Sequence, residues 1–393
     1  SLRLRSKNDW GRLDMTSELS SLCSYAKGKV SVDTLSKRNY VSTENMMPNK
    51  GGIVDAGALP SAQYTQQYIK DDILVSNIRP YFKKIWMADD DGGCSNDVLV
   101  FRADRGCDST FLYYILANDA FFNYASATSK GTKMPRGDKT AIMQYKVPCF
   151  NYETQLRIGK LLRSIDDRIA VNKKINDNLQ QQLFSLYENM ATASPCLKEY
   201  TLSNLCNFQE GYVNPPQTHP EYFDGEVKWL RAVDINESFI IETSRTLTKA
   251  GFESAKKSAL LFEPNTIAIS KSGTIGRLGI IADYMCGNRA VINIAPHDTN
   301  MLAFIYCFLK SKQREFPDMA VGSVQKNLYV SLLEPLSVSI PDNESLTAFN
   351  AVGASILGMI HNNCVENTDL ANLRDTILPK LMSGEIDVSS VLL

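Results

Sequence analysis

Residues 155–190 read QLRIGKLLRSIDDRIAVNKKINDNLQQQLFSLYENM, and this stretch decides how the rest of the chain is organised. Apolar residues recur along it at alternating steps of four and three, which is the period of helices that pack lengthwise on one another. We therefore predict a long helix with a packing seam. At a rise of 1.5 Å per residue, a helix of roughly 35–40 residues is about 50–60 Å long. The seam positions are Ile158, Leu162, Ile165, Ile169, Asn172, Asn176, Leu179, Leu183, Leu186 and Met190.

A second seam repeats the first at a shift of 191 residues. Its positions are Phe349, Gly353, Ile356, Ile360, Asn363, Asn367, Leu370, Arg374, Ile377 and Leu381, and all but Gly353 and Arg374 keep the character of their counterparts. Segments before each seam also match. These pairs are Leu22-Cys23 with Leu205-Cys206, 73–76 with 267–270, and Val147-Pro148 with Ile340-Pro341. The chain is therefore one unit of about 190 residues present twice.

Two asparagines interrupt each seam at the same steps, Asn172 and Asn176 in the first copy and Asn363 and Asn367 in the second. A buried asparagine weakens a seam but fixes its register, because its amide is satisfied only opposite a polar partner. We predict that the two helices pack on each other with these asparagines facing. The alternative is that all of them are solvated residues on amphipathic helices.

The remaining pattern predicts mixed α/β (α+β) globular segments. Apolar runs of strand length occur at 73–76, 98–101, 266–270 and 290–294, and helical patterns occur at 109–125 and 301–314. We predict two globular α/β domains separated by two long antiparallel coiled-coil helices, with a pseudo-twofold internal repeat. The expected limits are 1–150 for the first domain, 151–193 for the first helix, 194–342 for the second domain, and 343–393 for the second helix and tail.

Composition sets limits on the class of protein. Of the 393 residues 44% are hydrophobic, which is enough to bury sizeable cores. No apolar stretch reaches membrane-spanning length, and the first thirty residues lack the apolar core of a signal peptide, so a soluble cytoplasmic protein is expected. The nine cysteines are scattered and only three histidines are present, which predicts reduced, mostly buried thiols and no metal site.

No catalytic motif is found, and we expect no cofactor. The sequence has no phosphate-binding P-loop, no nucleophile elbow and no zinc-protease helix motif. Residues 214–217, Asn-Pro-Pro-Gln, resemble the Asn-Pro-Pro-aromatic motif of amino methyltransferases. Gln217 stands where the base-stacking aromatic ring belongs, and no glycine-rich methyl-donor loop precedes it, so the two prolines are better explained as stiffening a loop.

Basic loops are the best candidates for a binding function. The net charge of −1 hides an uneven distribution, since residues 1–150 carry +4 and residues 343–393 carry −4. Segments 130–139 and 76–84 of the first copy are polar and cationic, as are 270–279 and 322–327 of the second. Such loops can neutralise phosphates, and arginine can also make forked contacts to guanine. The alternatives are solvated loops and tight hairpin turns with incidental charges.

The order of these features, present twice, resembles the specificity (S) subunit of type I restriction-modification systems. The similarity covers almost the whole chain. It rests on three sequence segments, which are the helix sequence 155–169, Lys228-Trp229-Leu230-Arg231, and the C-terminal segment 377–386. It also rests on the order of loop, strand and proline, which ends at Pro148 in the first copy and at Pro341 in the second. The resemblance is weakest at residues 1–15, and Gly353 and Arg374 depart from the second seam.

This resemblance implies two target-recognition domains, each reading one half of a bipartite DNA sequence. It also implies that the helices set the unread spacer and dock two methyltransferase (M) subunits, to which restriction (R) subunits can be added. The chain itself is then not an enzyme, because the catalytic residues lie in its partners. The alternatives are a self-contained DNA adenine methyltransferase, suggested by residues 214–217, and a coiled-coil scaffold with no role on DNA.

Residue type and loop position select the candidate DNA contacts. We expect cations to anchor phosphates, and arginine, lysine, asparagine, glutamine and hydroxyl side chains to read base edges. The candidates are Arg79, Lys83, Lys84, Lys130, Lys133 and Arg136 in the first domain, and Arg231, Lys271, Ser272, Thr274, Arg277, Arg289 and Lys326 in the second.

Overall fold

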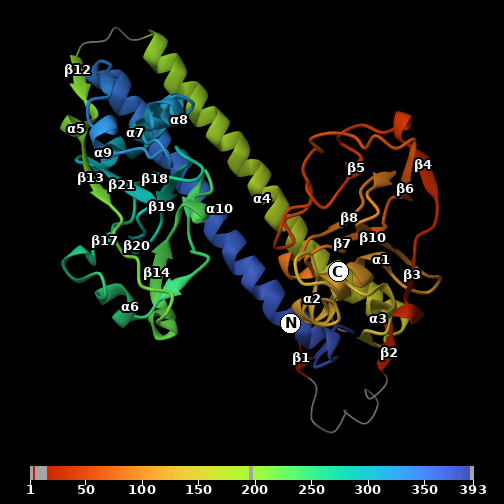
Figure 1. Cartoon of the computed structure of the whole chain (residues 1–393). Coiled ribbons are helices and arrows are strands. Elements are labelled where there is room, and N and C mark those ends of the chain that lie inside the picture. The colour runs from red at the N-terminus through yellow and green to blue at the C-terminus, as the bar shows by residue number, and fades with distance from the viewer. Residues whose placement is uncertain (1–2, 5–15, 194–197, 390–393) are drawn as a thin grey trace. The chain divides into compact units, whose positions relative to one another are not determined.

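The computed structural model describes residues 3–4, 16–193 and 198–389. The chain divides into two compact units, unit 1 (residues 1–167 and 370–393) and unit 2 (residues 168–369). Both units combine small β-sheets, short helices and segments of the same two long helices (Figure 1). The division cuts through both long helices, whereas the domain limits expected from the sequence end each domain where its helix begins. Those limits remain a prediction.

Unit 1 contains two four-stranded sheets. The first has the order β3-β10-β7-β8 and the second β4-β6-β9-β5. Their strands are β3 (Cys23–Tyr25), β4 (Lys29–Ser31), β5 (Tyr40–Val41), β6 (Tyr64–Tyr68), β7 (Ile73–Ser76), β8 (Ile85–Met87), β9 (Gly92–Cys94) and β10 (Val98–Ala103). Two short pairs complete the unit, β2 (Thr16–Glu18) with β11 (Lys146–Pro148), and β1 (Arg3–Leu4) with β23 (Ile386–Asp387). Its short helices are η2 (Leu19–Ser21), η3 (Val32–Thr34), η4 (Pro80–Phe82), α1 (Ser109–Ala117), α2 (Asp119–Ala127) and α3 (Lys139–Met143).

Unit 2 has a similar plan, with a five-stranded sheet where unit 1 has its first four-stranded sheet. Its sheets have the orders β13-β21-β18-β19-β15, β16-β14-β20-β17 and β12-β22. The strands are β12 (Lys198–Thr201), β13 (Cys206–Glu210), β14 (Phe223–Leu230), β15 (Phe239–Ile240), β16 (Thr246–Leu247), β17 (Leu261–Phe262), β18 (Ile267–Ser270), β19 (Leu278–Ile281), β20 (Met285–Gly287), β21 (Val291–Pro296) and β22 (Ser337–Ile340). The helices are α5 (Leu202–Leu205), η5 (Pro220–Tyr222), η6 (Ala232–Asp234), α6 (Lys249–Glu253), η7 (Lys256–Ser258), η8 (Thr299–Met301), α7 (Leu302–Lys312), α8 (Phe316–Met319) and α9 (Val330–Leu333).

Strand pairing confirms the internal duplication. β10 lies between β3 and β7 in unit 1, and β21 lies between β13 and β18 in unit 2, with antiparallel pairing in every case. β5 pairs parallel with β9, and β14 pairs parallel with β20. Strand β15 pairs with β19, and the described residues of unit 1 contain no counterpart of it. The helix expected over 109–125 is divided into α1 and α2 at Asn118, whose side chain accepts a hydrogen bond from the amide of Ala120 (2.9 Å).

The two seams form α4 (Tyr152–Ala193) and α10 (Asn343–Met382). Each helix begins a few residues after the strand and proline that precede it in its copy of the repeat. At that point the side chain of a short polar residue accepts a hydrogen bond from a backbone amide of the first helical turn. Asn151 accepts from Thr154 and Asp342 accepts from Ser345, both at 2.8 Å. This is the usual N-cap, and it stabilises a helix start by about 1 kcal/mol.

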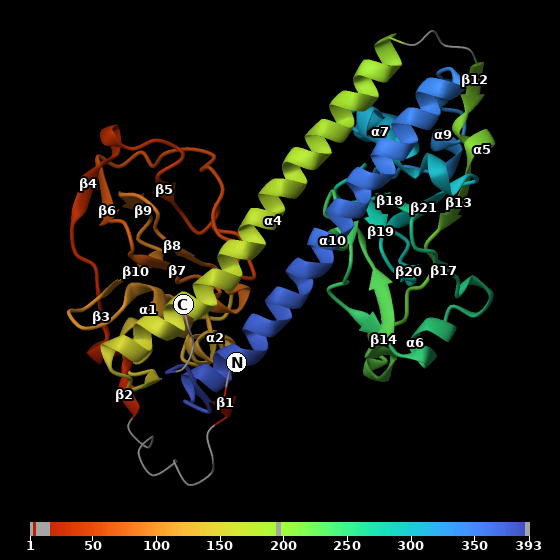
Figure 2. The ribbon, with the colours of Figure 1, turned by 180° about the vertical axis from the view of Figure 1, so that it is seen from behind.

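Helices α4 and α10 run side by side within unit 2 (Figure 2), and their hydrogen bonds show that asparagines of the two helices face each other there. Asn363 Nδ2 donates to Asn176 Oδ1 (2.8 Å), and Asn172 Nδ2 donates to Asn367 Oδ1 (3.0 Å). Because 172 corresponds to 363 and 176 to 367, the two bonds are related by the repeat. The contacts agree with the predicted facing of the asparagines and show that the helices are antiparallel there. Their role in fixing register remains a prediction.

Both departures from the second seam have a structural reason. A Cβ atom on Gly353 would lie 2.6 Å from Ala303 Cβ, so glycine allows α7 to approach α10 closely. Arg374 belongs to unit 1, where its Nη1 lies 2.6 Å from Asp166 Oδ1 and Asp166 Oδ2 accepts the hydroxyl of Tyr114 (2.6 Å). An ion pair therefore replaces an apolar contact between α4 and α10 at this level.

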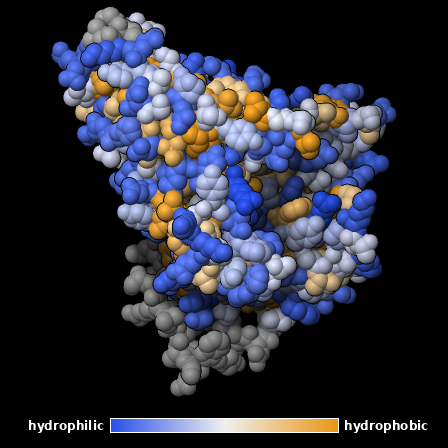
Figure 3. Space-filling model, turned by 60° about the vertical axis from the view of Figure 1, so that its left-hand side comes forward, coloured by the Kyte–Doolittle hydropathy of each residue, from blue (hydrophilic) through white to orange (hydrophobic). Residues whose placement is uncertain are grey.

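Apolar side chains form buried cores in both units. The largest cluster lies in unit 2, where strands β18, β19 and β21 pack with α7 and the seam residues Leu183, Phe349, Ile356 and Ile360. On the face shown in Figure 3, hydrophobic residues form small groups among hydrophilic ones. Of the described cysteines, five are buried and Cys149 is exposed. Cys196 lies outside the described residues.

Candidate nucleic-acid interface

Two of the basic segments of unit 1 lie against each other. The amide of Arg79 donates to the carbonyl of Pro135 (2.8 Å), and the amide of Gly137 donates to the carbonyl of Asn77 (3.1 Å). Arg136 forms backbone bridges with both Ile78 and Lys130. The turn after β7 and the loop 130–137 are therefore held together by main-chain bonds.

Unit 2 brings its corresponding segments together in the same way. The amide of Leu328 donates to the carbonyl of Lys271 (2.9 Å), as Gly137 does to Asn77. A backbone bridge between Val321 and Asn327 closes the second loop, as the bridge between Lys130 and Arg136 closes the first. The pairing of a turn with a loop is thus part of the duplicated framework.

The other predicted contacts of unit 2 join the same set of turns. The amide of Lys271 donates to the carbonyl of Ala290 (2.7 Å), which places Arg289 one residue from this turn. The amide of Asn288 donates to the carbonyl of Leu230 (2.9 Å), which brings in Arg231. Backbone bonds therefore connect all the turns that carry the predicted contacts of the second domain.

The backbone around η4 is strained. Arg79 and Lys83 flank η4 with φ of 51° and 52°, and Asn49 and Lys50 have φ of 55° and 61°. The amides of Asn49 and Lys50 donate to the carbonyls of Phe82 and Lys83, both at 2.8 Å. Left-handed conformations of residues other than glycine cost roughly 1 kcal/mol each and gather at functional sites. This strain supports a functional role for the turn that carries the predicted cations.

Most cations of these loops in unit 1 already have partners. Asp119 binds both Lys83 (2.8 Å) and Lys50 (2.9 Å). Burial raises the pKa of Asp119, but the hydrogen bonds from the two lysines outweigh burial and hold the pKa below its usual value. Lys84 is half-buried beside Phe82 and donates to the carbonyl of Thr43 (2.6 Å), and burial lowers its pKa.

The exposed loop 130–137 holds weaker pairs. Lys130 pairs with Asp138 (2.6 Å) and Arg136 pairs with Asp97 (3.1 Å). The hydrogen bond from Lys130 lowers the pKa of Asp138. Lys133 is exposed and has no side-chain partner among the residues described. Ion pairs on the surface are weak because water screens them, so these cations can exchange a carboxylate for a phosphate at little cost.

In unit 2 the predicted cations divide into held and free side chains. Lys271 is only 13% exposed, pairs with Glu210 at 2.9 Å and lies over the ring of Tyr329. Burial raises the pKa of Glu210, but its hydrogen bonds with Lys271 and Tyr212 outweigh burial and lower it. The charge of Lys271 is therefore balanced by Glu210 within the fold. Among the described residues, the side chains of Ser272, Thr274, Arg277, Arg289 and Lys326 have no polar partner.

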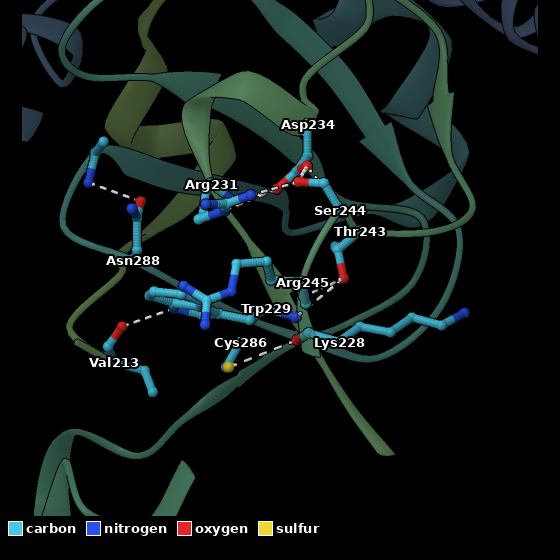
Figure 4. A network of polar contacts seen from close by, with 11 residues as sticks. Val213, Lys228, Trp229, Arg231, Asp234, Thr243, Ser244, Arg245, Cys286 and Asn288 are labelled. Atoms are coloured by element: carbon cyan, nitrogen blue, oxygen red, sulfur yellow. Dashed lines mark hydrogen bonds and ion pairs between the residues drawn. The ribbon is translucent and has the colours of Figure 1, made fainter. Parts of the chain in front are cut away.

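Arg231 belongs to a polar network at the end of β14 (Figure 4). Its guanidinium Nη2 donates to Ser244 Oγ (2.5 Å), and its Nε lies 3.7 Å from Asp234 Oδ2. The guanidinium carbon lies 5.6 Å from the centre of the Trp229 ring. The indole Nε1 of Trp229 donates to the carbonyl of Val213 (2.8 Å). The network fixes the direction of the arginine side chain.

Sequence reasoning missed two cations near these turns. Lys50 shares Asp119 with Lys83, and the Gly51-Gly52 turn signal beside it was the only local hint. Arg245 stacks on Phe223 with 4.2 Å from its guanidinium carbon to the ring centre, and it donates to Gln217 Oε1 (2.9 Å). The strand pair β14 and β16 brings these residues together, and no short-range pattern indicates it.

The Asn-Pro-Pro-Gln segment has an internal role. Gln217 accepts a hydrogen bond from Arg245, and the carbonyl of Val213, just before the segment, accepts a hydrogen bond from the indole of Trp229.

Among residues 16–193 and 198–389, no three His, Cys, Asp or Glu side chains are grouped so that they could hold a metal ion. Likewise, no helix of the described ranges is both long and apolar enough to cross a membrane.

Comparisons with known proteins agree with this architecture. A family model described as the type I restriction modification DNA specificity domain matches residues 15–181 and again residues 197–368. The type I restriction enzyme MjaIX specificity subunit of Methanocaldococcus jannaschii is 24% identical over 309 residues, which are 73% of this chain and 71% of that protein. The type I restriction enzyme HindI specificity subunit of Haemophilus influenzae is 27% identical over 176 residues, which are 44% of this chain and 38% of that protein.

A solved structure shares the fold. The S subunit of a type I restriction-modification system from M. genitalium aligns with a TM-score of 0.56 and 18% identity, over 95% of this chain and 97% of that one. The chain belongs to the family of type I restriction modification DNA specificity domains. With two copies of the domain in one chain, it is a type I restriction-modification specificity subunit. The readings as a self-contained methyltransferase or as a scaffold with no DNA role are not favoured.

Proposed function

We propose that the chain reads a bipartite DNA sequence, one half-site per domain, and carries no catalytic residues. In this proposal α4 and α10 set the length of the unread spacer and dock two methyltransferase (M) subunits, to which restriction (R) subunits can be added in the cytoplasm. The methyl transfer and DNA cleavage belong to those partners. The observation that carries the proposal is the duplicated specificity domain, in which each copy has the same bonded turn and loop.

The proposed division of labour follows from the charges of the described side chains. Exposed or weakly paired cations suit phosphate anchoring, because contacts to phosphates need charge more than direction. Held side chains suit base reading, because hydrogen bonds to base edges need direction. On these grounds we propose Lys130, Lys133, Arg136, Arg277, Arg289 and Lys326 as phosphate anchors. The candidates that we keep as contacts to either phosphates or base edges are Arg79, Lys83, Lys84, Arg231, Ser272 and Thr274. For Lys271 we propose that it positions its turn.

Methylation mapping tests the function directly. Host DNA is sequenced for methylated bases in cells that have the M subunits, with and without this chain. The expected result is a two-part methylated motif with an unread spacer, present only when the chain is expressed. Methylation that does not depend on the chain, or that lacks two separated parts, would overturn the proposal.

Salt dependence tests the predicted phosphate anchors of loop 130–137. Each cation that contacts a phosphate contributes about 0.9 to the slope of log affinity against log salt. The triple variant Lys130→Ala/Lys133→Ala/Arg136→Ala, assembled with M subunits, should therefore bind target DNA with a slope lower by about 2 to 3. Titration of labelled duplex at several salt concentrations measures the slope.

The matched control removes three exposed cations outside the loop. Lys27→Ala/Lys70→Ala/Arg105→Ala makes the same change in net charge within the first domain. Its slope should stay close to that of the unmodified chain. If both triple variants change the slope equally, or neither does, loop 130–137 does not touch the DNA.

A further inference from the structure

The turn after β14 has a structural equivalent in the first domain. The carbonyl of Leu230 accepts the amide of Asn288 (2.9 Å) in unit 2, and the carbonyl of Val41 accepts the amide of Ser95 (2.8 Å) in unit 1. In both places a two-stranded parallel pair, β14 with β20 and β5 with β9, ends at this bond. The residue that follows the strand is Arg231 in unit 2 and, correspondingly, residue 42 in unit 1.

The same side-chain bond closes both turns. The amide of Arg231 donates to Asp234 Oδ2 (2.9 Å), and the amide of Ser42 donates to Asn45 Oδ1 (2.6 Å). Arg231 therefore corresponds to Ser42, and Asp234 corresponds to Asn45, each at the same spacing of three. An arginine with an aspartate in one domain is matched by a serine with an asparagine in the other, on one backbone framework.

The Arg231 guanidinium is held on three sides. Ser244 accepts from Nη2, Asp234 lies beside Nε, and the Trp229 ring lies beneath the group. Asp234 itself is only 4% exposed, and its Oδ1 accepts both the amide and the hydroxyl of Ser244. Both ends of the ion pair are thus fixed by the fold (Figure 4).

Part of this guanidinium lacks an acceptor. Arg231 Nε is buried beside Asp234 and is not available to a ligand, whereas Nη1 makes no hydrogen bond within the described part of the chain. Because Asp234 balances its charge, the pair offers little net charge to a phosphate. What remains is the outer end of the guanidinium, Nη1 and the second hydrogen of Nη2, and these donors suit a planar pair of acceptors better than a phosphate.

We propose that Arg231 determines one base of the second half-site by a forked contact to guanine, and that Asp234 and Ser244 position it. The proposal rests on the proposed function and names the ligand of one of its residues. Guanine presents the O6 and N7 acceptors side by side in the major groove, and arginine is their usual partner. A side chain whose orientation is already fixed loses less entropy when it binds.

The equivalent position of the first domain cannot make this contact. Ser42 is short and neutral, and its hydroxyl already bonds Asn45 Oδ1 (3.1 Å). The first half-site is therefore read without a forked arginine at this place. The two half-sites differ in sequence there although the two turns share one backbone.

The experiment maps methylation by the complex of this chain with its M subunits on a library of targets that vary in the second half-site. Arg231→Lys keeps the positive charge but cannot make a forked contact. Arg231→Ser/Asp234→Asn copies the first domain's turn into the second. Both should lower the preference for guanine at a single position by about 5-fold to 160-fold, because a forked pair discriminates by about 1–3 kcal/mol. The first half-site should not change.

Lys257→Ser is the matched control, an exposed cation of the same domain in η7, and it should leave both half-sites unchanged. The proposal is overturned if the complex that contains the Arg231→Lys variant methylates DNA with the original base preference at every position of the target. It is also overturned if Arg231→Lys and the double variant weaken binding equally on all sequences, which indicates a phosphate contact. Failure of the unmodified complex to methylate a bipartite motif would instead refute the proposed function.

Discussion

Replacing Asn363 by leucine should destabilise unit 2 by stranding a buried acceptor. Asn176 is 5% exposed, and its Oδ1 accepts from Asn363 Nδ2 at 2.8 Å. Leucine offers no donor, so this oxygen stays buried without a partner, which costs about 1–3 kcal/mol. For a unit of about 200 residues, 1 kcal/mol corresponds to roughly 2–4 °C in melting temperature. The melting transition of unit 2 should therefore fall by about 2–12 °C.

Replacing both asparagines should recover most of this loss. With Asn176→Leu/Asn363→Leu the stranded oxygen is gone, and two leucines continue the apolar seam. The donor Nδ2 of Asn176 makes only long contacts, to Ile360 O and Cys364 Sγ, both at 3.4 Å, so little else is lost. The double variant should melt at or above the temperature of the unmodified chain.

Thermal unfolding of the full chain followed by circular dichroism completes the double-mutant cycle. The expected coupling energy between the two sites is about 1–3 kcal/mol, because each single variant loses the same hydrogen bond and the double variant loses it only once. Asn362→Leu is the control, an exposed asparagine one residue away on α10, and it should have little effect. Additive single effects, with the double variant the least stable, would show that the asparagines do not depend on each other.

Two further predictions concern packing and thiol chemistry. Gly353→Ala should destabilise unit 2 by about 1–3 kcal/mol in thermal unfolding, because the new methyl group would lie 2.6 Å from Ala303 Cβ, and an unchanged melting curve would show that α7 yields freely. At pH 8 a thiol reagent should modify the exposed Cys149 but not Cys206 or Cys286, since burial raises the pKa of both to about 12 and keeps them protonated and enclosed. Peptide mapping before and after unfolding checks this, and equal labelling of all three in the folded chain would contradict it.

The sequence predicts the periodic parts of the fold well. Both long helices and the duplication follow from local spacing, since one buried face leaves its period in the chain. Strands such as 73–76 are buried on both faces and follow instead from a continuous apolar run. The division of 109–125 into two helices depends on one side chain, Asn118, which ends an apolar pattern that otherwise continues. Short strands of two residues, such as β5 and β15, leave no period to read.

The candidate site is less predictable because its chemistry depends on distant partners. The turns chosen by loop position are connected through backbone bonds in the structure, and their contact with DNA stays a prediction. Residue type alone cannot separate Lys271, whose charge is balanced by Glu210 from 61 residues away, from Arg289, which has no partner within the described residues. Likewise the match of Ser42 to Arg231 is invisible in the sequence, since the residues differ in size and charge and only the backbone reveals it.

The main-chain bonds that hold the turns proposed to contact DNA have a consequence for how such a protein changes over evolutionary time. The bonds from Asn288 to Leu230 and from Ser95 to Val41 use no side-chain atom, so they survive substitution at the positions beside them. A point mutation in one turn can then alter the preferred sequence without unfolding its domain. Since each domain has its own core, the other half of the target is inherited unchanged, and new specificities arise one half at a time.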